Sequence, residues 1–416
     1  MGSVVPLAVL LAVLFLIAVR KVGAVRLQIW QIVVGGALAV LLTGQISAQN
    51  ALAAINTDLL VFLFGTFVIG EALSRSGYLF HVAYRIFGRA TTVRRLVLLI
   101  IIATGLLSAL LMNDTLAIVA TPLMLYYAAR FGISEKLLLL ALAFGVTTGS
   151  VASPIGNPQN LLIALDGGLE NPFVTFFVYL AVPTVLCLLL AYAVLILRFR
   201  HEIPEIPLVH LCEEITDARL AFLARISLTT LVLLIGIKVV AVLLGVQIAI
   251  PLPYVALIAA LPVLIGSEKR LDVLRSIDWR TLLFFAALFV LLGSVWQSGF
   301  FQPLIDNARF DLTAVPVILA ASVILSQFVS NVPFVALYLP ILTQIGVSSR
   351  ELAALAAGST IAGNMLIMGA ASNVIIIQNA ERHGMTLTFR EFAEVGIPLT
   401  LLQAAVYWLF LAVIPW

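Results

Sequence analysis

The stretch Ser150-Val-Ala-Ser-Pro-Ile-Gly-Asn-Pro-Gln-Asn160 interrupts a segment that is otherwise apolar from Leu137 to Leu165. Its prolines, glycine and amide side chains do not continue a lipid-facing helix, because proline removes a backbone donor and clashes with the preceding turn. Non-helical backbone at membrane depth is stable only where protein or a water-filled cavity satisfies its polar groups. The stretch therefore predicts a broken helix of the kind at which secondary transporters bind substrate. A loop at the membrane surface is the alternative.

The composition indicates a membrane protein. Of the 416 residues, 62% are hydrophobic and only 10% are charged, which excludes a soluble domain of this size and predicts many apolar helices of about 20 residues. The sequence shows no phosphate-binding loop, Cys/His cluster or metal-ligand spacing. We therefore expect no enzyme activity, cofactor, metal or nucleic-acid partner. Cys187 lies in an apolar run and Cys212 in a charged linker, which predicts no disulfide.

Basic residues orient the predicted helices. The apolar run 4–19 is followed by Arg20 and Lys21, whereas a signal peptide carries its charge before the apolar region, so this run is read as a first membrane helix. With the N-terminus outside, basic residues concentrate strongly in the inner loops. Only Arg309 and Arg350 fall outside. This predicts a multi-pass protein of a bacterial or archaeal plasma membrane with both termini extracytoplasmic.

The two halves of the chain share their rarer helix-breaking and amide residues at nearly constant offsets. The pairs are Asn113/Asn331, Pro122/Pro340, Gly145/Gly358, Gly156/Gly369, Asn160/Asn373 and Pro183/Pro398. Each half holds five predicted spans and one hairpin, and because five is odd the halves have opposite orientations, as in transporters with alternating access. The expected boundaries are 1–198 for the first repeat, 199–225 for a cytoplasmic linker and 226–416 for the second repeat.

Residues 96–130 and 312–346 are consistent with either two full spans or one re-entrant hairpin each, since the charge pattern is the same for both. Their tips, Asn113-Asp114 and Ser330-Asn331, are short and suit tight hairpins. Residues 78–89 alternate apolar and basic side chains, which predicts an amphipathic helix at the membrane interface.

Four polar breaks result, two in each half, and they supply the candidate substrate site. Helix N-termini and free carbonyls at such breaks bind ions and polar solutes. For a single asparagine the alternative is a hydrogen bond between helices. The candidate substrate-binding residues are Asn113, Thr115, Ser153, Gly156, Asn157, Gln159, Asn160, Ser330, Asn331, Asn364, Gly369, Ser372 and Asn373.

Asp114 and Glu71 are the carboxylates that lie well inside apolar runs, so both are candidates for proton or cation coupling. Asp114 has a simpler alternative role as the cap of the helix that follows the first tip. Glu71 also has a simpler alternative role as the ion-pair partner of Arg75, which lies four residues later on the same helix face.

At these residues the chain resembles the ion transporter superfamily, which includes divalent-anion/sodium symporters, sodium/proton antiporters and arsenite efflux permeases. The resemblance rests on Ser153-Pro-Ile-Gly-Asn-Pro-Gln-Asn160, the Asn113 tip and Ser330-Asn331-Val-Pro333, and it covers nearly the whole chain. It implies an all-α fold of two inverted repeats, each with five transmembrane helices and one re-entrant hairpin. It also implies a homodimer whose scaffold, about 1–95 and 226–311, holds an elevator-type transport domain, about 96–198 and 312–416.

The tips also bear on the substrate. Sodium/dicarboxylate members carry Ser-Asn-Thr at both tips, whereas Asn113-Asp114 and Asn331-Val-Pro333 are more similar to the arsenite permease branch. That similarity implies proton-coupled export of arsenite or antimonite as neutral hydroxides, with a soluble ATPase as a possible partner. A predicted core without Arg or Lys other than Lys238 fits a neutral substrate.

The rival hypothesis is sodium- or proton-coupled transport of a small anion such as a dicarboxylate, citrate or sulfate, because half-helix N-termini bind a carboxylate without arginine. Sodium/proton antiport is a further alternative. A channel or a structural membrane protein is disfavoured by the repeat and the paired breaks.

Overall fold

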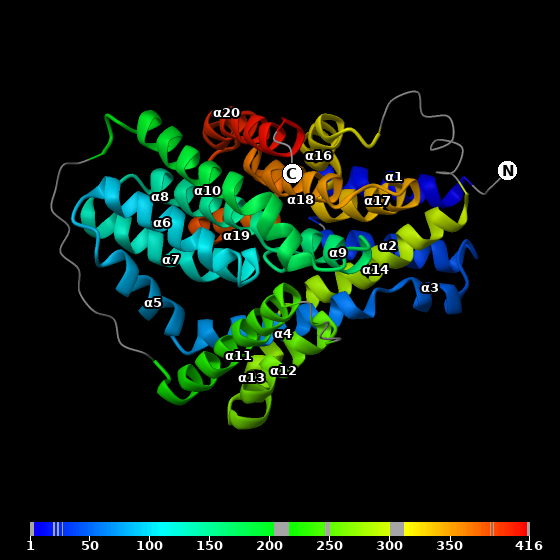
Figure 1. The fold of residues 1–416 in the computed structure, drawn as a ribbon, viewed down its shortest axis with the longest axis horizontal. Coiled ribbons are helices and arrows are strands. Elements are labelled where there is room, and N and C mark those ends of the chain that lie inside the picture. The colour runs from blue at the N-terminus through cyan, green and yellow to red at the C-terminus, as the bar shows by residue number, and fades with distance from the viewer. Residues whose placement is uncertain are drawn as a thin grey trace.

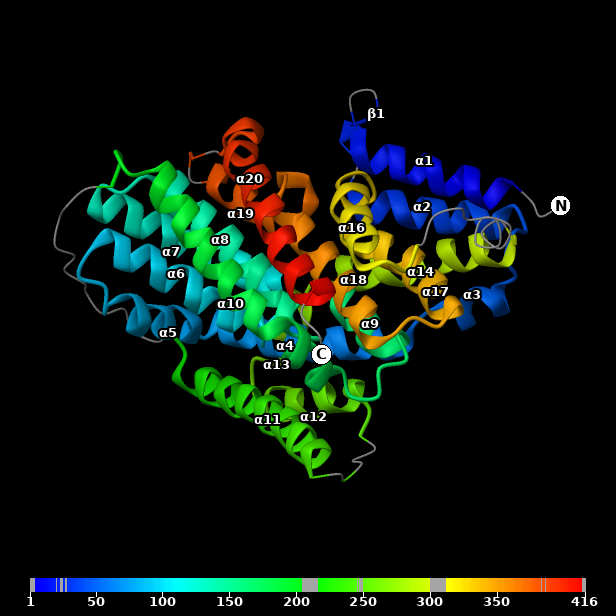
Figure 2. The same cartoon turned by 45° about the horizontal axis from the view of Figure 1, so that its top comes forward.

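The computed structural model is almost entirely helical (Figures 1 and 2). It describes residues 4–413 apart from 20, 23–24, 27, 204–215, 245, 247–249, 300–311, 383 and 386. The prediction of an all-α membrane fold is confirmed. A two-residue antiparallel ladder, β1 (Lys21–Val22) with β2 (Val25–Arg26), joins the first two helices.

The first half of the chain runs from the N-terminal helix to a long helix ending at Arg198. Its helices are α1 (Val5–Val19), α2 (Ile29–Leu42), α3 (Ala48–Ala54), α4 (Thr57–Arg75), α5 (Tyr78–Phe87), α6 (Val93–Ser108), α7 (Asn113–Phe131), α8 (Glu135–Gly149), the 3-10 turn η1 (Ser150–Ala152), α9 (Pro158–Asp166) and α10 (Pro172–Arg198).

The second half repeats this order. Its helices are α11 (Ala218–Leu243), α12 (Leu252–Gly266), α13 (Arg270–Ser276), α14 (Trp279–Gln297), α16 (Val315–Val329), α17 (Asn331–Ile345), α18 (Ser349–Ile361), the 3-10 turns η2 (Ala362–Asn364) and η3 (Ile367–Gly369), α19 (Ala371–Arg382), α20 (Phe389–Trp408) and the π-helical turn η4 (Leu409–Val413).

Several helices of each half pack against helices of the other half. Helix α2 packs on α14, and α12 packs on α4. Helices α6 and α7 pack on α8, as α16 and α17 pack on α18, while α7 contacts α19 and α17 contacts α9. The first hairpin and the second lie on different sides of the molecule in Figure 1. Each half thus contacts the other through its broken helix, a pattern consistent with the two predicted repeats.

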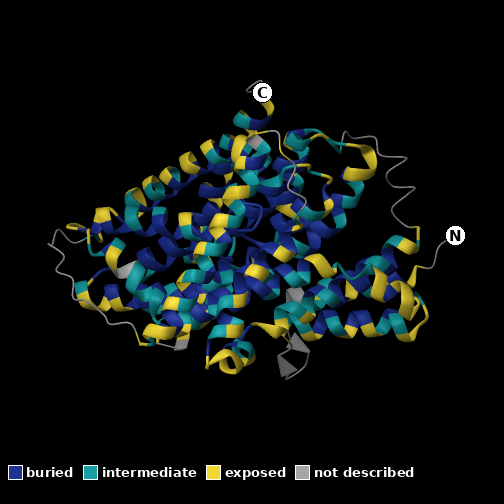
Figure 3. Ribbon diagram, turned by 60° about the horizontal axis from the view of Figure 1, so that its bottom comes forward, coloured by how far each residue is buried: buried dark blue, intermediate teal, exposed yellow. Residues whose placement is uncertain are grey.

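Within the described ranges, six helices are long and apolar enough to cross a membrane: 57–75, 135–152, 172–198, 218–242, 279–297 and 389–412. Exposed residues recur along the outer helices (Figure 3). On α10 these exposed side chains are apolar and include Phe177, Val185 and Leu189. Helices α1, α2 and α12 have 14 or 15 residues and are shorter than the helices of about 20 residues that the composition predicted.

The hairpin helices are not among these six. Helices α16 and α17 have 15 residues each, or about 22 Å, against a hydrocarbon core of about 30 Å. This length favours a re-entrant hairpin over two full spans in the second half. Helix α7 of the first hairpin has 19 residues, as many as α4 and α14, so length does not decide the case there.

The break at residues 150–157 is confirmed. Helix α8 ends at Gly149 and α9 begins at Pro158, and Ser150, Ile155 and Asn157 between them are buried. The alternative of a loop at the surface is therefore wrong. The predicted interfacial helix is present as α5.

The linker prediction needs a correction at its end. Helix α11 begins at Ala218, capped by Asp217, and not at residue 226, because the Asp217 carboxylate accepts a hydrogen bond from the Leu220 amide at 2.9 Å and starts the helix early. Residues 204–215, including Cys212, lie outside the described residues.

Glycines bring each broken helix against its hairpin, backbone to backbone. A Cβ on Gly149 of α8 would lie 2.2 Å from Cα of Gly105 on α6, and one on Gly358 of α18 would lie 2.7 Å from Cβ of Ser322 on α16. Small residues allow such close approach between membrane helices. Each hairpin and its broken helix therefore form one tightly packed unit.

Candidate substrate-binding site

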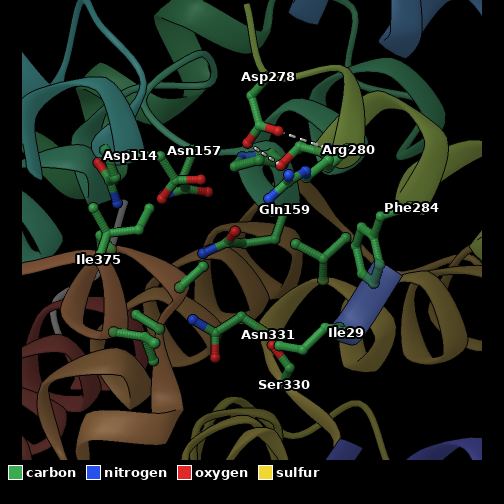
Figure 4. Close-up of a pocket in the computed structure, with 18 of the residues that line it drawn as sticks. Ile29, Asp114, Asn157, Gln159, Asp278, Arg280, Phe284, Ser330, Asn331 and Ile375 are labelled. Atoms are coloured by element: carbon green, nitrogen blue, oxygen red, sulfur yellow. Dashed lines mark hydrogen bonds between the residues drawn. The ribbon is translucent and has the colours of Figure 1, made fainter. Parts of the chain in front are cut away.

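A cavity of about 1060 Å³ lies where the two hairpin tips meet the two helix breaks (Figure 4). Four half-helices begin at its wall, with Asn113 of α7, Pro158 of α9, Asn331 of α17 and Ala371 of α19. The first turns of α2 and α14 line it as well. Helix N-termini carry positive partial charge and unpaired N–H groups, so this geometry suits an anion.

The cavity brings together about half of the predicted site residues. Those that line it are Asn113, Asp114, Asn157, Gln159, Ser330, Asn331 and Ser372. The remaining candidates are not among the lining residues: Thr115, Ser153, Gly156, Asn160, Asn364, Gly369, Asn373 and Glu71. Several of these hold the breaks in shape.

The first tip is tied to the first break through Asn113. Its Oδ1 accepts a hydrogen bond from Ser108 Oγ at 2.6 Å, and its Nδ2 donates to Ser150 Oγ at 3.2 Å. Its backbone N–H donates to the carbonyl of Gly156 at 3.3 Å. A Cβ on Gly156 would lie 2.7 Å from the Ser108 carbonyl oxygen, so only glycine allows this approach.

The break itself is held by two asparagines. Asn157 caps α9 through its Oδ1, which accepts from the Asn160 amide at 2.9 Å, and its Nδ2 donates to Ser150 Oγ and Thr360 Oγ1. Asn160 donates Nδ2 to the carbonyls of Ser150 and Ser153, at 3.0 and 3.1 Å. Since Asn160 satisfies the carbonyls that the break frees, its role in the structure is to hold the backbone.

The second tip is less completely hydrogen-bonded. Gln327 Oε1, Asn331 Oδ1 and Asn373 Oδ1 are buried and have no hydrogen-bond partner in the described part of the chain. Ser330 has a φ of 73°, a left-handed conformation that is uncommon for residues other than glycine. Unpartnered buried acceptors and backbone strain both occur at ligand sites.

The donors of these amide side chains are used within the second break. Gln327 donates Nε2 to the Ala362 carbonyl at 2.8 Å, and Asn373 donates Nδ2 to the Gly363 carbonyl at 2.6 Å. The side-chain nitrogens of Gln327 and Asn373 are thus hydrogen-bonded, which holds both side chains in place and leaves their oxygens without a donor in the described part of the chain.

Asn364 connects the second break to neighbouring helices. Its Nδ2 donates to Thr148 Oγ1 and to Gln403 Oε1, both at 2.9 Å. Gln403 also donates to Thr148 Oγ1 at 3.0 Å. This is the hydrogen bond between helices that was the alternative reading for a single asparagine.

The two predicted coupling carboxylates have different surroundings. Asp114 lines the cavity from the first turn of α7. Glu71 forms an ion pair with Arg75, Oε1 to Nε at 2.7 Å, which confirms the pairing that their spacing predicted. Thr115 packs against Gly70 of α4, where an added Cβ would lie 2.8 Å from its Cγ2.

Sequence reasoning missed the charged residues at the mouth of the cavity. Asp278, the N-cap of α14, and Arg280 in its first turn line the cavity together with Gln28, the N-cap of α2. Arg280 donates Nη1 to Gln28 Oε1 at 3.3 Å, and Trp30 Nε1 donates to the same oxygen at 2.7 Å. The expected core contained no arginine or lysine other than Lys238, and Arg280 lies outside that core, exposed at the edge of the cavity.

Two threonines were also missed, since a lone threonine in an apolar helix carries no distinctive signal. Thr147 of α8 and Thr360 of α18 line the cavity. Thr360 Oγ1 donates to Asn160 Oδ1 at 3.2 Å, which links the second half to the first break. Lys238, by contrast, lies half-buried on α11, where it donates to the carbonyl of Ile250.

Apolar helices, paired hairpin tips and broken helices around a cavity with amide and carboxylate side chains define the class of the protein, which is a multi-pass membrane transporter. The chain matches the family described as Citrate transporter (CitMHS) over residues 12–352, and it belongs to that family. The resemblance to the ion transporter superfamily is confirmed at this level.

Relatives and a solved structure agree with this assignment. The chain is 30% identical over 381 residues to an uncharacterized transporter of Mycobacterium tuberculosis, covering 86% of this chain and 87% of that protein. It is 25% identical to the silicon efflux transporter LSI3 of Oryza sativa, over 89% and 90% of the two chains. The crystal structure of the Alcanivorax borkumensis YdaH transporter superposes with a TM-score of 0.60 at 16% identity, covering 98% of this chain and 96% of that one. The last similarity shows a shared fold.

Proposed function

We propose that the protein is a secondary active transporter of a small carboxylate anion of the citrate type, coupled to protons or another cation. The observation that carries this proposal is the convergence of the N-termini of α7, α9, α17 and α19 on one cavity. Each N-terminus is equivalent to about +0.5 elementary charge. Together they offset the Asp114 and Asp278 carboxylates, and Arg280 adds a full positive charge at the mouth.

Coupling is assigned to Asp114 and to the acceptor oxygens of the second tip. A carboxylate at membrane depth carries a proton or a cation. Amide oxygens without donors, such as those of Gln327 and Asn331, coordinate a hard cation but not an anion. An anion on the helix N-termini and a cation on these oxygens would each lower the electrostatic cost of binding the other. Glu71, already paired with Arg75, is the less suitable coupling residue.

The test is transport by the purified protein in proteoliposomes. Labelled citrate, succinate and sulfate are offered separately under an imposed proton gradient, an imposed sodium gradient, or no gradient. We expect saturable citrate uptake that requires one of the two gradients. Equal, non-saturating flux with and without gradients would contradict secondary transport, and saturation by sulfate alone would contradict the carboxylate assignment.

Efflux of a neutral hydroxide such as arsenite or antimonite is the second candidate. Two observations favour it: the neutral amide and hydroxyl groups that line much of the cavity, and the relative named as a silicon efflux transporter. Expression in an arsenite-sensitive bacterium decides this case. Restored growth on arsenite would support it, and no protection despite confirmed membrane expression would contradict it.

We further propose that the chain works as an elevator in a homodimer. The close approach of Gly65 on α4 to the backbone of Ala256 on α12 supports a scaffold formed by 1–95 and 226–311. The hairpins and broken helices of 96–198 and 312–416 form another. With the orientation set by the basic loops, the cavity mouth at Arg280 is cytoplasmic, so this conformation faces inward.

A further inference from the structure

Two scaffold residues occupy equivalent places in the two halves. Asn56 caps α4 and Asp278 caps α14, and both helices have 19 residues. Asn56 Oδ1 accepts from the Leu59 amide at 2.9 Å, and Asp278 Oδ1 accepts from the Thr281 amide at 3.1 Å. In each case the donor lies three residues after the cap.

Two residues of the half-helices are equivalent in the same way. Asp166 ends α9 six residues after Asn160, and Asn379 lies in α19 six residues after Asn373. Asn160 and Asn373 both donate Nδ2 to a carbonyl ten residues earlier, which fixes the correspondence of α9 with α19. Each half thus pairs a cap position on the scaffold with a half-helix position.

The two pairs are in different states. In the first half, Asn56 Nδ2 donates to both carboxylate oxygens of Asp166 at 2.9 Å, and α4 packs against α9. In the second half, Asp278 and Asn379 both line the open cavity, where Asn379 Nδ2 donates to the Ile118 carbonyl at 3.1 Å. The first pair is closed while the second lies on the walls of the cavity.

The chemistry of the second pair is that of the first with the partners exchanged. The scaffold supplies an amide and the half-helix a carboxylate in the first pair, and the reverse holds in the second. Donors and acceptors still match. Asp278 Oδ1 accepts from the Thr281 amide, and Oδ2 accepts from Thr281 Oγ1 at 2.5 Å. Oδ2 can accept a further hydrogen bond from Asn379 Nδ2.

We propose that Asn56–Asp166 and Asp278–Asn379 are alternating latches on the transport pathway. The first closes the end of the pathway opposite the cavity mouth in the present conformation. When the half-helices cross to the other conformation, the first pair separates and the second forms, which closes the present mouth. The proposal rests on the transporter class and not on the identity of the substrate.

Disulfide trapping tests the two contacts. In a Cys187→Ala, Cys212→Ser background, we expect Asn56→Cys/Asp166→Cys to cross-link and stop transport reversibly. Asp278→Cys/Asn379→Cys should cross-link in a different fraction of the molecules. When citrate and a gradient are supplied, we expect the cross-linked fraction of this second pair to rise while that of the first pair falls. A second pair that never cross-links in an otherwise active protein would overturn the proposal. So would full cross-linking of both pairs within one molecule.

An exchange of partners tests the chemistry without disulfides. Asn56→Asp places two carboxylates together, so we expect at least a fivefold loss of transport. Accessibility of Gln378→Cys at the present mouth to an impermeant thiol reagent should also fall. Asn56→Asp/Asp166→Asn recreates the order of the second pair and should restore both readouts.

The matched control is Asn50→Asp, an exposed asparagine on α3 that donates to Gln297 Oε1 away from the pathway. It should leave both readouts near wild type. A double variant no better than Asn56→Asp would overturn the latch while leaving the transporter assignment intact. Absence of transport in the wild type, with normal cross-linking of both pairs, would instead count against the proposed substrate.

Discussion

Asn113 and Asn331 stand at the tips of the two hairpins and are almost equally buried, at 7% and 6% exposure. Asn113 uses Oδ1, Nδ2 and its backbone N–H to hold the first break. Asn331 Oδ1 has no partner in the described part of the chain. A buried unpartnered acceptor costs about 1–3 kcal/mol. The first tip therefore stabilises the fold, whereas the second keeps an acceptor available at the expense of stability.

The backbone shows the same contrast. The residue before the first tip asparagine, Met112, has a φ of −59°, and the residue before the second, Ser330, has a φ of 73°. Strain of this kind persists where the surrounding structure imposes it and is common at ligand sites. The first tip is thus held by hydrogen bonds on an ordinary backbone, whereas the second combines an unpartnered acceptor with a strained backbone, which fits the binding role proposed for it.

The largest effect is expected from the asparagines within the breaks. Asn160→Leu should lower the free energy of unfolding by about 3–5 kcal/mol, because it orphans several buried carbonyls. Asn373→Leu should cost about 1–2 kcal/mol, since it removes one bond and also one unpartnered oxygen. Thermal unfolding in detergent measures both. An equal or larger loss for Asn373→Leu would remove the contrast.

The tips themselves come next. Asn113→Ala should destabilise the protein by about 2 kcal/mol, because it breaks the link from the first tip to Ser150. Asn331→Ala should leave stability within about 0.5 kcal/mol but lower transport at least tenfold, because it removes a free acceptor. Uptake at equal reconstituted amounts, together with unfolding temperature, separates the two behaviours. Wild-type transport by Asn331→Ala would show that its oxygen binds nothing.

The residues that follow the tip asparagines also differ, Asp114 in the first and Val332 in the second. Asp114→Asn keeps shape and polarity but removes titration. We expect it to fold and bind substrate but to lose gradient-driven flux about tenfold. The alternative role as a cap is not observed, because Met112 is the N-cap of α7 and no side-chain cap hydrogen bond forms there. A merely structural role of Asp114 in the first turn predicts nearly normal transport for Asp114→Asn. Flux under a gradient is compared with gradient-free exchange in the same vesicles, and loss of both alike would point to binding and not to coupling.

The smallest effect concerns the strained residue. Ser330→Gly should stabilise the protein by about 1 kcal/mol, because glycine adopts a positive φ without steric cost. Met112→Gly at the first tip should destabilise it by a similar amount, since flexibility is added where φ is ordinary. The sign of the two shifts in unfolding temperature is the readout, and two shifts of the same sign would contradict the comparison.

The sequence was sufficient for the breaks, the tips and the helical class, because proline, glycine and asparagine inside apolar runs are local signals. The Glu71–Arg75 pair was predictable for the same reason, being one turn apart. The hydrogen-bonding roles were not predictable, since those of Asn160, Asn364 and Gln403 depend on helices that meet only in the fold. The part that Arg280 plays in lining the cavity was not predictable, because a rule that assigns charges to loops contains no information on how far a cavity extends.

Helix α5 joins the end of α4 to the base of the first hairpin and has a consequence for range of motion. Gly77, with a φ of 76°, precedes it, and Gly88 follows it. A helix of ten residues is a stiff rod of about 15 Å with a pivot at each end. This rod connects the base of the first hairpin to α4. If α5 swung through 180° about its α4 end, its other end would move by twice its length, or roughly 30 Å. Residues 88–92 between this rod and α6 add further reach, so the short helix and the segment after it together bear on how far the first hairpin could travel.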